Sequence, residues 1–81
     1  MEMEKEIIEK IKTLIESLLE EEKNRLLAGI FPAPLNNLTW KNLFLIWQRC
    51  EKEEFCKIGI GKKLRNLLRG LKNSGYFEDF E

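Results

Sequence analysis

Residues 62–73 have the sequence KKLRNLLRGLKN, which is the clearest helical pattern in the chain. Leu64, Leu67, Leu68 and Leu71 recur at spacings of three and four. These spacings place all four leucines on one side of an α-helix, where they can be buried together. A serine and a glycine follow directly and predict the end of the helix. The segment therefore predicts a helix with one apolar face packed on a core.

The opposite side of this helix holds basic residues and asparagines. On a helical wheel with Leu64 at zero, Arg65, Arg69, Lys62 and Asn66 fall at about 100°, 140°, 160° and 200°. Such residues contact phosphates and base edges in nucleic-acid complexes. We therefore predict a nucleic-acid-binding face, although a simple solvated helix face and a docking site for an acidic protein are the alternatives. The predicted binding residues are Lys62, Lys63, Arg65, Asn66, Arg69 and Lys72.

The charges of the chain are segregated although they sum to zero, with 14 basic and 14 acidic residues among 81. Residues 2–22 hold eight glutamates and three lysines. Residues 55–77 hold six lysines and arginines and no acidic residue. A helix that is merely solvated usually mixes charges of both signs, so this separation favours the binding face.

Residues 3–28 are expected to form a long amphipathic helix that ends before Gly29. Its apolar pattern lapses between residues 20 and 25, where a bend or a split is expected. The apolar stripe exceeds what one small core needs, so it is a candidate surface for a homodimer or for another protein. The predicted interface positions are Ile8, Ile11, Ile15 and Leu18.

Residues 30–38 contain two prolines and form a linker that is expected to pack on the core through Ile30, Phe31, Leu35 and Leu38. Thr39 is the expected N-cap of the next helix, with Asn36 or Asn37 as alternatives.

Residues 40–52 are predicted to form that helix. The residues Trp40, Leu43, Trp47 and Cys50 share one face, and the segment is apolar around much of its circumference. It is therefore the expected central helix, with its tryptophans in the core rather than exposed as a ligand platform.

A short helix is expected over residues 55–58, followed by a tight turn at Gly59-Ile60-Gly61. The last residues, 76–81, alternate weakly between apolar and polar, which is typical of a short strand or a docked tail. Together these elements predict one all-α, or nearly all-α, domain over residues 1–81. It would be a bundle of about four helices, in which residues 40–81 form a unit like a helix-turn-helix.

Residues 53–78, EEFCKIGIGKKLRNLLRGLKNSGYFE, resemble the helix-turn-helix core of winged-helix DNA-binding proteins. The resemblance implies a turn at 58–61, a recognition helix from Lys62 onward and an entry to the wing at Gly75-Tyr76-Phe77. The turn is one residue shorter than the family pattern, and the residues after Phe77 are too few for a two-stranded wing. A version without a wing, or a relative used for protein contacts, would fit these departures.

The same residues also resemble a helix-hairpin-helix element, in which a Gly-hydrophobic-Gly hairpin offers backbone amides to a phosphate. Gly59-Ile60-Gly61 matches this hairpin, but Arg65 stands where that family has a small residue. Both resemblances imply nucleic acid; the first implies groove reading and the second implies backbone contact alone.

Composition points away from catalysis. Histidine, the commonest general base and a common metal ligand, is absent from the sequence. The chain lacks a phosphate loop of the Walker type, a serine nucleophile elbow and a dinucleotide fingerprint. We therefore expect no enzyme, no cofactor, no metal and no small-molecule substrate.

The compartment expected from the sequence is the cytoplasm. The acidic start differs from a signal peptide, and the apolar run 43–47 is too short to span a membrane. Two cysteines, Cys50 and Cys56, are expected to be reduced. The predicted function is nucleic-acid binding, with duplex DNA favoured, by a small regulator or accessory factor. The alternative is a helical adaptor whose basic ridge docks an acidic protein.

Overall fold

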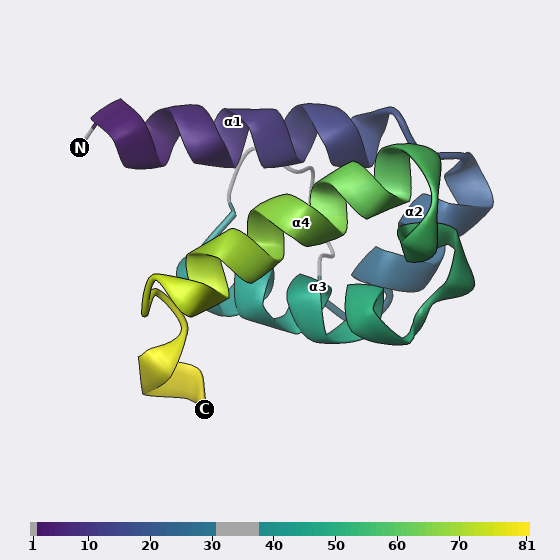
Figure 1. The fold of residues 1–81 in the computed structure, drawn as a ribbon. Coiled ribbons are helices and arrows are strands. Elements are labelled where there is room, and N and C mark those ends of the chain that lie inside the picture. The colour runs from purple at the N-terminus through teal and green to yellow at the C-terminus, as the bar shows by residue number, and fades with distance from the viewer. Residues whose placement is uncertain (1, 31–37) are drawn as a thin grey trace.

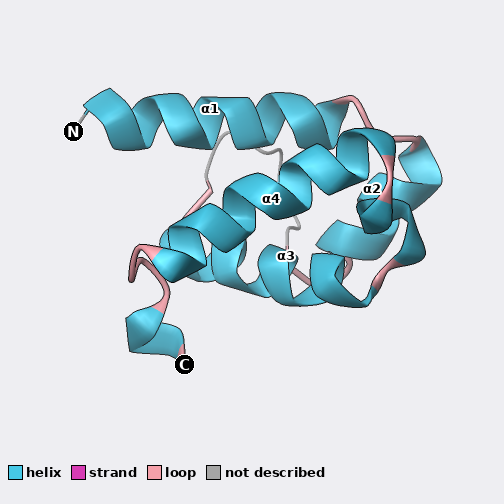
Figure 2. Cartoon of the chain, in the orientation of Figure 1, coloured by secondary structure: helices cyan, strands magenta, loops and turns pink. Residues whose placement is uncertain are grey.

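Helix α4 lies between α1 and α3 and holds the fold together (Figure 1). The computed structural model describes residues 2–30 and 38–81. All regular elements in these residues are helical, so the all-α prediction is confirmed (Figure 2). They are α1 (Glu2–Glu16), α2 (Glu20–Leu27), α3 (Trp40–Lys52), the 3₁₀ turn η2 (Glu54–Lys57), α4 (Gly59–Asn73) and the 3₁₀ turn η3 (Glu78–Phe80).

The leucine stripe of α4 is buried as its spacing predicts. Leu64 and Leu68 are fully buried, Leu71 is nearly so, and Leu67 is half-buried at the edge of the core. This stripe packs against α1 on one side and α3 on the other. The central helix is therefore α4, and the expectation that residues 40–52 would be central is wrong.

The first amphipathic segment forms two helices, because the helical conformation is interrupted at residues 17–19. The amides of Ser17 and Leu18 donate to carbonyl oxygens three residues earlier, at 3.1 Å each, which tightens the last turn of α1. Leu18 thereby points into the core while the chain changes direction. Leu19 then begins α2, and its amide donates to the Glu22 side chain at 3.2 Å. The predicted helix over 3–28 is therefore split, as the expected bend or split allows, but the break falls at residues 17–19 rather than between residues 20 and 25.

Helix α3 has the bounds predicted for it, residues 40–52. Its N-cap is Thr39, whose hydroxyl accepts a hydrogen bond from the Asn42 amide at 3.1 Å, while the Asn42 side chain accepts one from the Thr39 amide at 3.1 Å. Both tryptophans, Trp40 and Trp47, are half-buried and pack against the core rather than standing free.

The two ends of the predicted linker meet the core. Ile30 and Leu38 are half-buried against it, as expected. The other linker residues singled out above, Phe31, Leu35, Asn36 and Asn37, lie outside the described residues.

The C-terminal residues turn back onto the core and form no strand. After α4 the amide of Tyr76 donates to the Leu71 carbonyl and that of Gly75 to the Lys72 carbonyl, both at 3.1 Å. This Schellman arrangement needs a left-handed residue, and Gly75 supplies it with φ of 90°. Phe77 is then fully buried. The predicted wing entry at residues 75–77 is therefore wrong, because these residues close α4 and anchor the tail.

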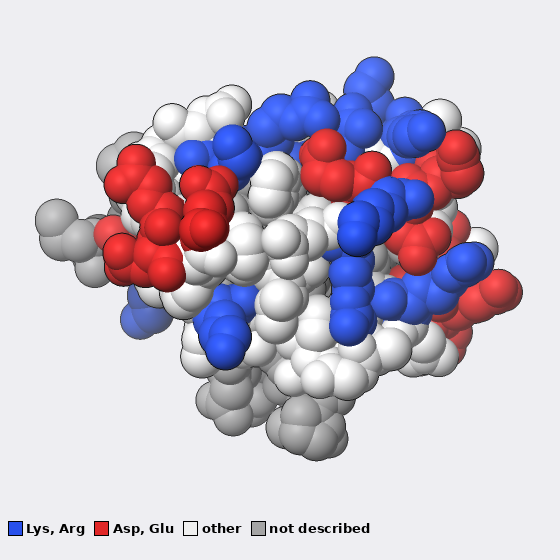
Figure 3. Space-filling view, turned by 90° about the horizontal axis from the view of Figure 1, so that it is seen from below, with Lys and Arg blue, Asp and Glu red and all other residues white. Residues whose placement is uncertain are grey.

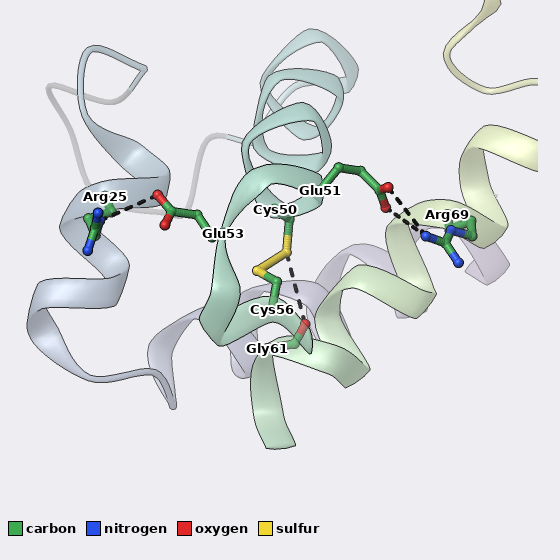
Figure 4. Close-up of a disulfide and its surroundings, with 7 residues drawn as sticks. All are labelled: Arg25, Cys50, Glu51, Glu53, Cys56, Gly61 and Arg69. Carbon is green, nitrogen blue, oxygen red and sulfur yellow. Dashed lines mark hydrogen bonds and ion pairs between the residues drawn. A yellow bond between two sulfur atoms is a disulfide. The ribbon is translucent and has the colours of Figure 1, made fainter. Parts of the chain in front are cut away.

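Cys50 and Cys56 form a disulfide, which corrects the expectation of two reduced thiols (Figure 4). The end of α3 and the turn η2 bring the two Cα atoms to 5.6 Å, a separation that a disulfide accommodates. Both residues are buried. The Cys50 sulfur also lies 4.0 Å from the Gly61 carbonyl oxygen, a packing contact because a disulfide sulfur has no hydrogen to donate. The cysteines therefore no longer support a reducing compartment.

The disulfide is expected to stabilise the fold modestly, because it closes a short loop. The loop-entropy relation for a bridge six residues apart gives about 2 kcal/mol. Reduction of the native protein should lower the urea midpoint accordingly, whereas the Cys50→Ala/Cys56→Ala variant should not respond to reductant. An unchanged midpoint in the native protein, with two free thiols titrated before reduction, would show that the bridge does not form.

Candidate nucleic-acid interface

Helix α4 places its polar residues toward solvent, opposite the buried leucines. Lys62, Asn66 and Arg69 are exposed, as the helical wheel predicts, and Lys63 is exposed as well. The helix as a whole, Gly59–Asn73, contains five lysines and arginines and no acidic residue. This side of α4, with Lys62, Lys63, Arg65, Asn66, Arg69 and Lys72, is called the basic face below.

Arg69 is tied to α3 by an ion pair. Its Nη2 lies 3.0 Å and 3.3 Å from the two carboxylate oxygens of Glu51 (Figure 4). Both side chains are substantially exposed, at 45% for Arg69 and 32% for Glu51. Ion pairs in such positions contribute little net free energy, about 0–1 kcal/mol, so a stronger anion can displace the glutamate.

Lys72 lies at the C-terminal end of the basic face and is also engaged. Its Nζ is 3.7 Å from a Glu81 carboxylate oxygen and 5.7 Å from the centre of a Trp47 ring. A cation over an aromatic face is stabilised electrostatically, which keeps this side chain against the protein. The end of the face near Lys72 is therefore less open to a ligand than the end near Lys62.

Arg65 is less accessible than its wheel position suggests. The residue is half-buried, and its Nε is enclosed with no hydrogen-bond partner among the described residues. The stem of Arg65 thus packs at the margin of the core. The sequence predicts which side of the helix Arg65 lies on. Its degree of burial depends on the neighbouring elements, which the spacing of residues does not reveal.

Acidic side chains lie beside the basic ones. Figure 3 shows Lys and Arg gathered along one edge of the molecule, with Asp and Glu next to them. Glu51 pairs with Arg69 and Glu81 with Lys72, and sequence analysis missed both acids as partners of the basic face. No spacing signal could identify them, because the contacts depend on how α3 and the tail pack against α4.

The predicted partner interface on the first helix is not a free surface. Ile11 and Ile15 are fully buried, Leu18 is 7% exposed, and Ile8 is half-buried against the core. The structure contradicts this prediction because α4 of the same chain covers the stripe. The apolar residues of α1 that looked too many for one small core are the residues that pack against α4.

The local geometry differs from both resemblances near the glycines. The predicted turn at 58–61 is largely helical, since α4 begins at Gly59. The element before it, η2, is a four-residue 3₁₀ turn rather than a full helix. Gly61 is buried where η2 packs against α4.

The chain matches no protein-family model, no curated protein and no solved structure. Among the described residues, every helix is too short or too polar to cross a membrane. Function therefore has to be inferred from the surface of α4 and its charges.

Proposed function

We propose that this protein binds nucleic acid through the basic face of α4, with duplex DNA as the favoured ligand. The observation that carries the proposal is the composition of α4: five cations and no acid on a helix whose leucines are buried. A helix of this kind can lie along a phosphate backbone with its cations toward the ligand. The net charge of the chain is zero, so the attraction is local to this face.

Contacts to the phosphate backbone account for most of the binding that we propose. Lys62 and Lys63 are exposed, and their flexible ammonium groups suit phosphates rather than one base. Arg69 would exchange Glu51 for a phosphate, since the pair is exposed. Asn66 is exposed on the same face, and we propose that it meets a base edge. Weak dependence on sequence is therefore expected.

The adaptor alternative is less supported, because the stripe proposed to hold a second protein is buried in the core. The part of the adaptor alternative that still stands is the docking of an acidic protein on the same basic face.

The proposal predicts salt-dependent binding to a labelled mixed-sequence duplex. Fluorescence anisotropy should give micromolar affinity near 50 mM salt and about a hundredfold weaker binding near 200 mM, which corresponds to about four phosphate contacts. The slope arises because bound cations release counterions from DNA. Absence of binding at low salt to duplex DNA, and to single-stranded DNA and RNA in the same assay, would overturn the proposal.

Charge-reversal variants test whether the binding face lies on α4. Lys62→Glu/Arg69→Glu reverses two exposed charges and should abolish binding while the far-ultraviolet circular dichroism is unchanged. Lys5→Glu/Lys41→Glu changes the net charge equally, away from α4, and should have little effect. Glu51→Gln frees Arg69 and should tighten binding. Equal weakening by both double variants would mean that α4 is not the interface.

A further inference from the structure

Three large apolar side chains are exposed at one end of the molecule, where α2 and α4 begin. Leu19 is 71% exposed, Ile58 72% and Ile60 38%. They line a common shallow hollow of about 260 Å³, together with Phe55. Contiguous apolar surface of this kind marks an interaction site more often than single scattered residues do. This surface, Leu19, Phe55, Ile58 and Ile60, is called the apolar end patch.

Two of these residues also occupy positions that favour polar side chains. Leu19 is the N-cap of α2 and Ile58 the N-cap of α4, and neither side chain accepts a hydrogen bond from its helix. Serine, threonine, aspartate or asparagine would stabilise either helix better than these residues do. Two N-cap positions on the same surface therefore hold residues that are unfavourable for helix stability. Burial of these side chains against a partner would explain why apolar residues occupy both positions.

The charges around the apolar end patch are opposite at its two sides. Beside Leu19, a second hollow is lined by Glu21, Glu22, Glu53 and Glu54 against Arg25 and Lys52, an excess of acid. Beyond Ile60, the first turns of α4 contain Lys62 and Lys63 and no acid. Glu21 and Lys63 are exposed, and neither forms an ion pair within the described residues.

We propose that the apolar end patch binds a second copy of this chain across a two-fold axis. In an isologous contact a residue i meets j and j meets i. Leu19 of one copy then packs on Ile58 and Ile60 of the second, and the second copy's Leu19 packs in return. The same two-fold rotation places the acidic residues beside Leu19 of each copy against Lys63 of the other copy. The charge contact therefore occurs twice in the dimer. A surface that is acidic at one side, apolar in the middle and basic at the other is complementary to itself.

The patch is small, which sets the strength of the dimer. A stable interface buries about 800 Å² on each partner, more than three or four side chains supply. The dimer is therefore expected to be weak and reversible. Lys62 and Arg69 lie on the outward side of α4, about 160° and 140° from Leu64 on the wheel, while Ile60 lies near 320°. Lys63 is the one residue that the proposed dimer shares with the basic face, and the apolar contacts of the dimer do not depend on nucleic-acid binding.

Sedimentation velocity of the full chain tests the proposal directly. Between about 10 and 500 µM protein in low salt, the weight-average mass should rise from 9.6 kDa toward twice that value. Higher salt should shift the rise to higher concentration, since charge pairs contribute. A mass that stays at 9.6 kDa throughout would overturn the proposal.

Serine substitutions separate association from folding. Ile58→Ser and Leu19→Ser remove the exposed apolar groups and install a preferred N-cap. Each variant should remain monomeric at the highest concentration, while its melting temperature stays equal to or above that of the native monomer. A variant that dimerises as the native chain does would place the contact elsewhere and overturn the proposal.

A charge exchange tests the two-fold arrangement. Glu21→Lys alone and Lys63→Glu alone each place like charges at both contacts and should dimerise at least tenfold more weakly. An equimolar mixture of the two variants restores opposite charges at both contacts and should recover the dimer. Lys41→Glu, at the exposed start of α3, is the matched control and should change nothing. Failure of the mixture to recover association would contradict the two-fold contact.

Discussion

Replacing Gly61 by alanine is expected to destabilise the protein by about 3 kcal/mol or more, the upper range for overpacking. A Cβ at this position would lie 2.1 Å from the Phe55 carbonyl oxygen and 2.8 Å from the Cys56 Cα. Both are backbone atoms, so no side-chain rotation relieves the clash. The turn η2 is itself held by the disulfide to α3 and by its packing on α4. Relief therefore requires η2 to separate from α4.

Gly70→Ala is the matched control on the same helix. A Cβ at Gly70 meets no atom within 4 Å, and the residue is helical and exposed. Alanine should stabilise the helix there by up to about 1 kcal/mol. Urea unfolding of both variants should thus give shifts of opposite sign, and a variant that does not fold at all satisfies the expectation for Gly61. Two shifts of the same sign and size would show that η2 does not pack on Gly61 as described.

The clash at Gly61 illustrates which parts of the fold sequence patterns can predict. The leucine stripe of α4 and both ends of α3 follow from spacing and from the cap residue Thr39. The role of Gly61 does not, because a glycine two positions after another glycine resembles a turn until η2 is known to pack on it. The break after α1 was misplaced for a related reason. Leucine is a poor N-cap, so Leu19 gives no signal of a new helix.

The remaining differences between the sequence-based predictions and the structure arise from contacts between elements that are distant in the sequence. Arg49 of α3 donates to the carbonyl oxygens of Leu26, at 3.2 Å, and of Ala28, and so satisfies the end of α2. On the basic face, the wheel predicted the exposure of Lys62 and Asn66. It could not predict the pairs of Arg69 and Lys72, whose partners are 18 and 9 residues away.

Phe77→Ala is expected to lower the free energy of unfolding by about 3–5 kcal/mol, the usual range for removing a buried phenylalanine. The side chain is fully buried. Its ring lies 5.6 Å from that of Phe44, edge to face, and 6.1 Å from that of Trp47. Such aromatic pairs add to the hydrophobic gain, because the positive edge of one ring meets the negative face of another. Loss of Phe77 leaves a cavity beside Phe44 and Trp47 of α3.

Phe80→Ala supplies the comparison within the same tail. Phe80 also packs on Phe44, with ring centres 5.7 Å apart, but it is only half-buried, so its loss should cost about 1–2 kcal/mol. Urea unfolding followed by tryptophan emission gives both values, and Trp47 should respond more strongly to the change at Phe77, its direct neighbour. Equal small losses for the two variants would mean that the tail is peripheral. The larger loss at Phe77 would instead make it part of the core, since the Gly75 turn directs this ring inward and ends α4 in the same step.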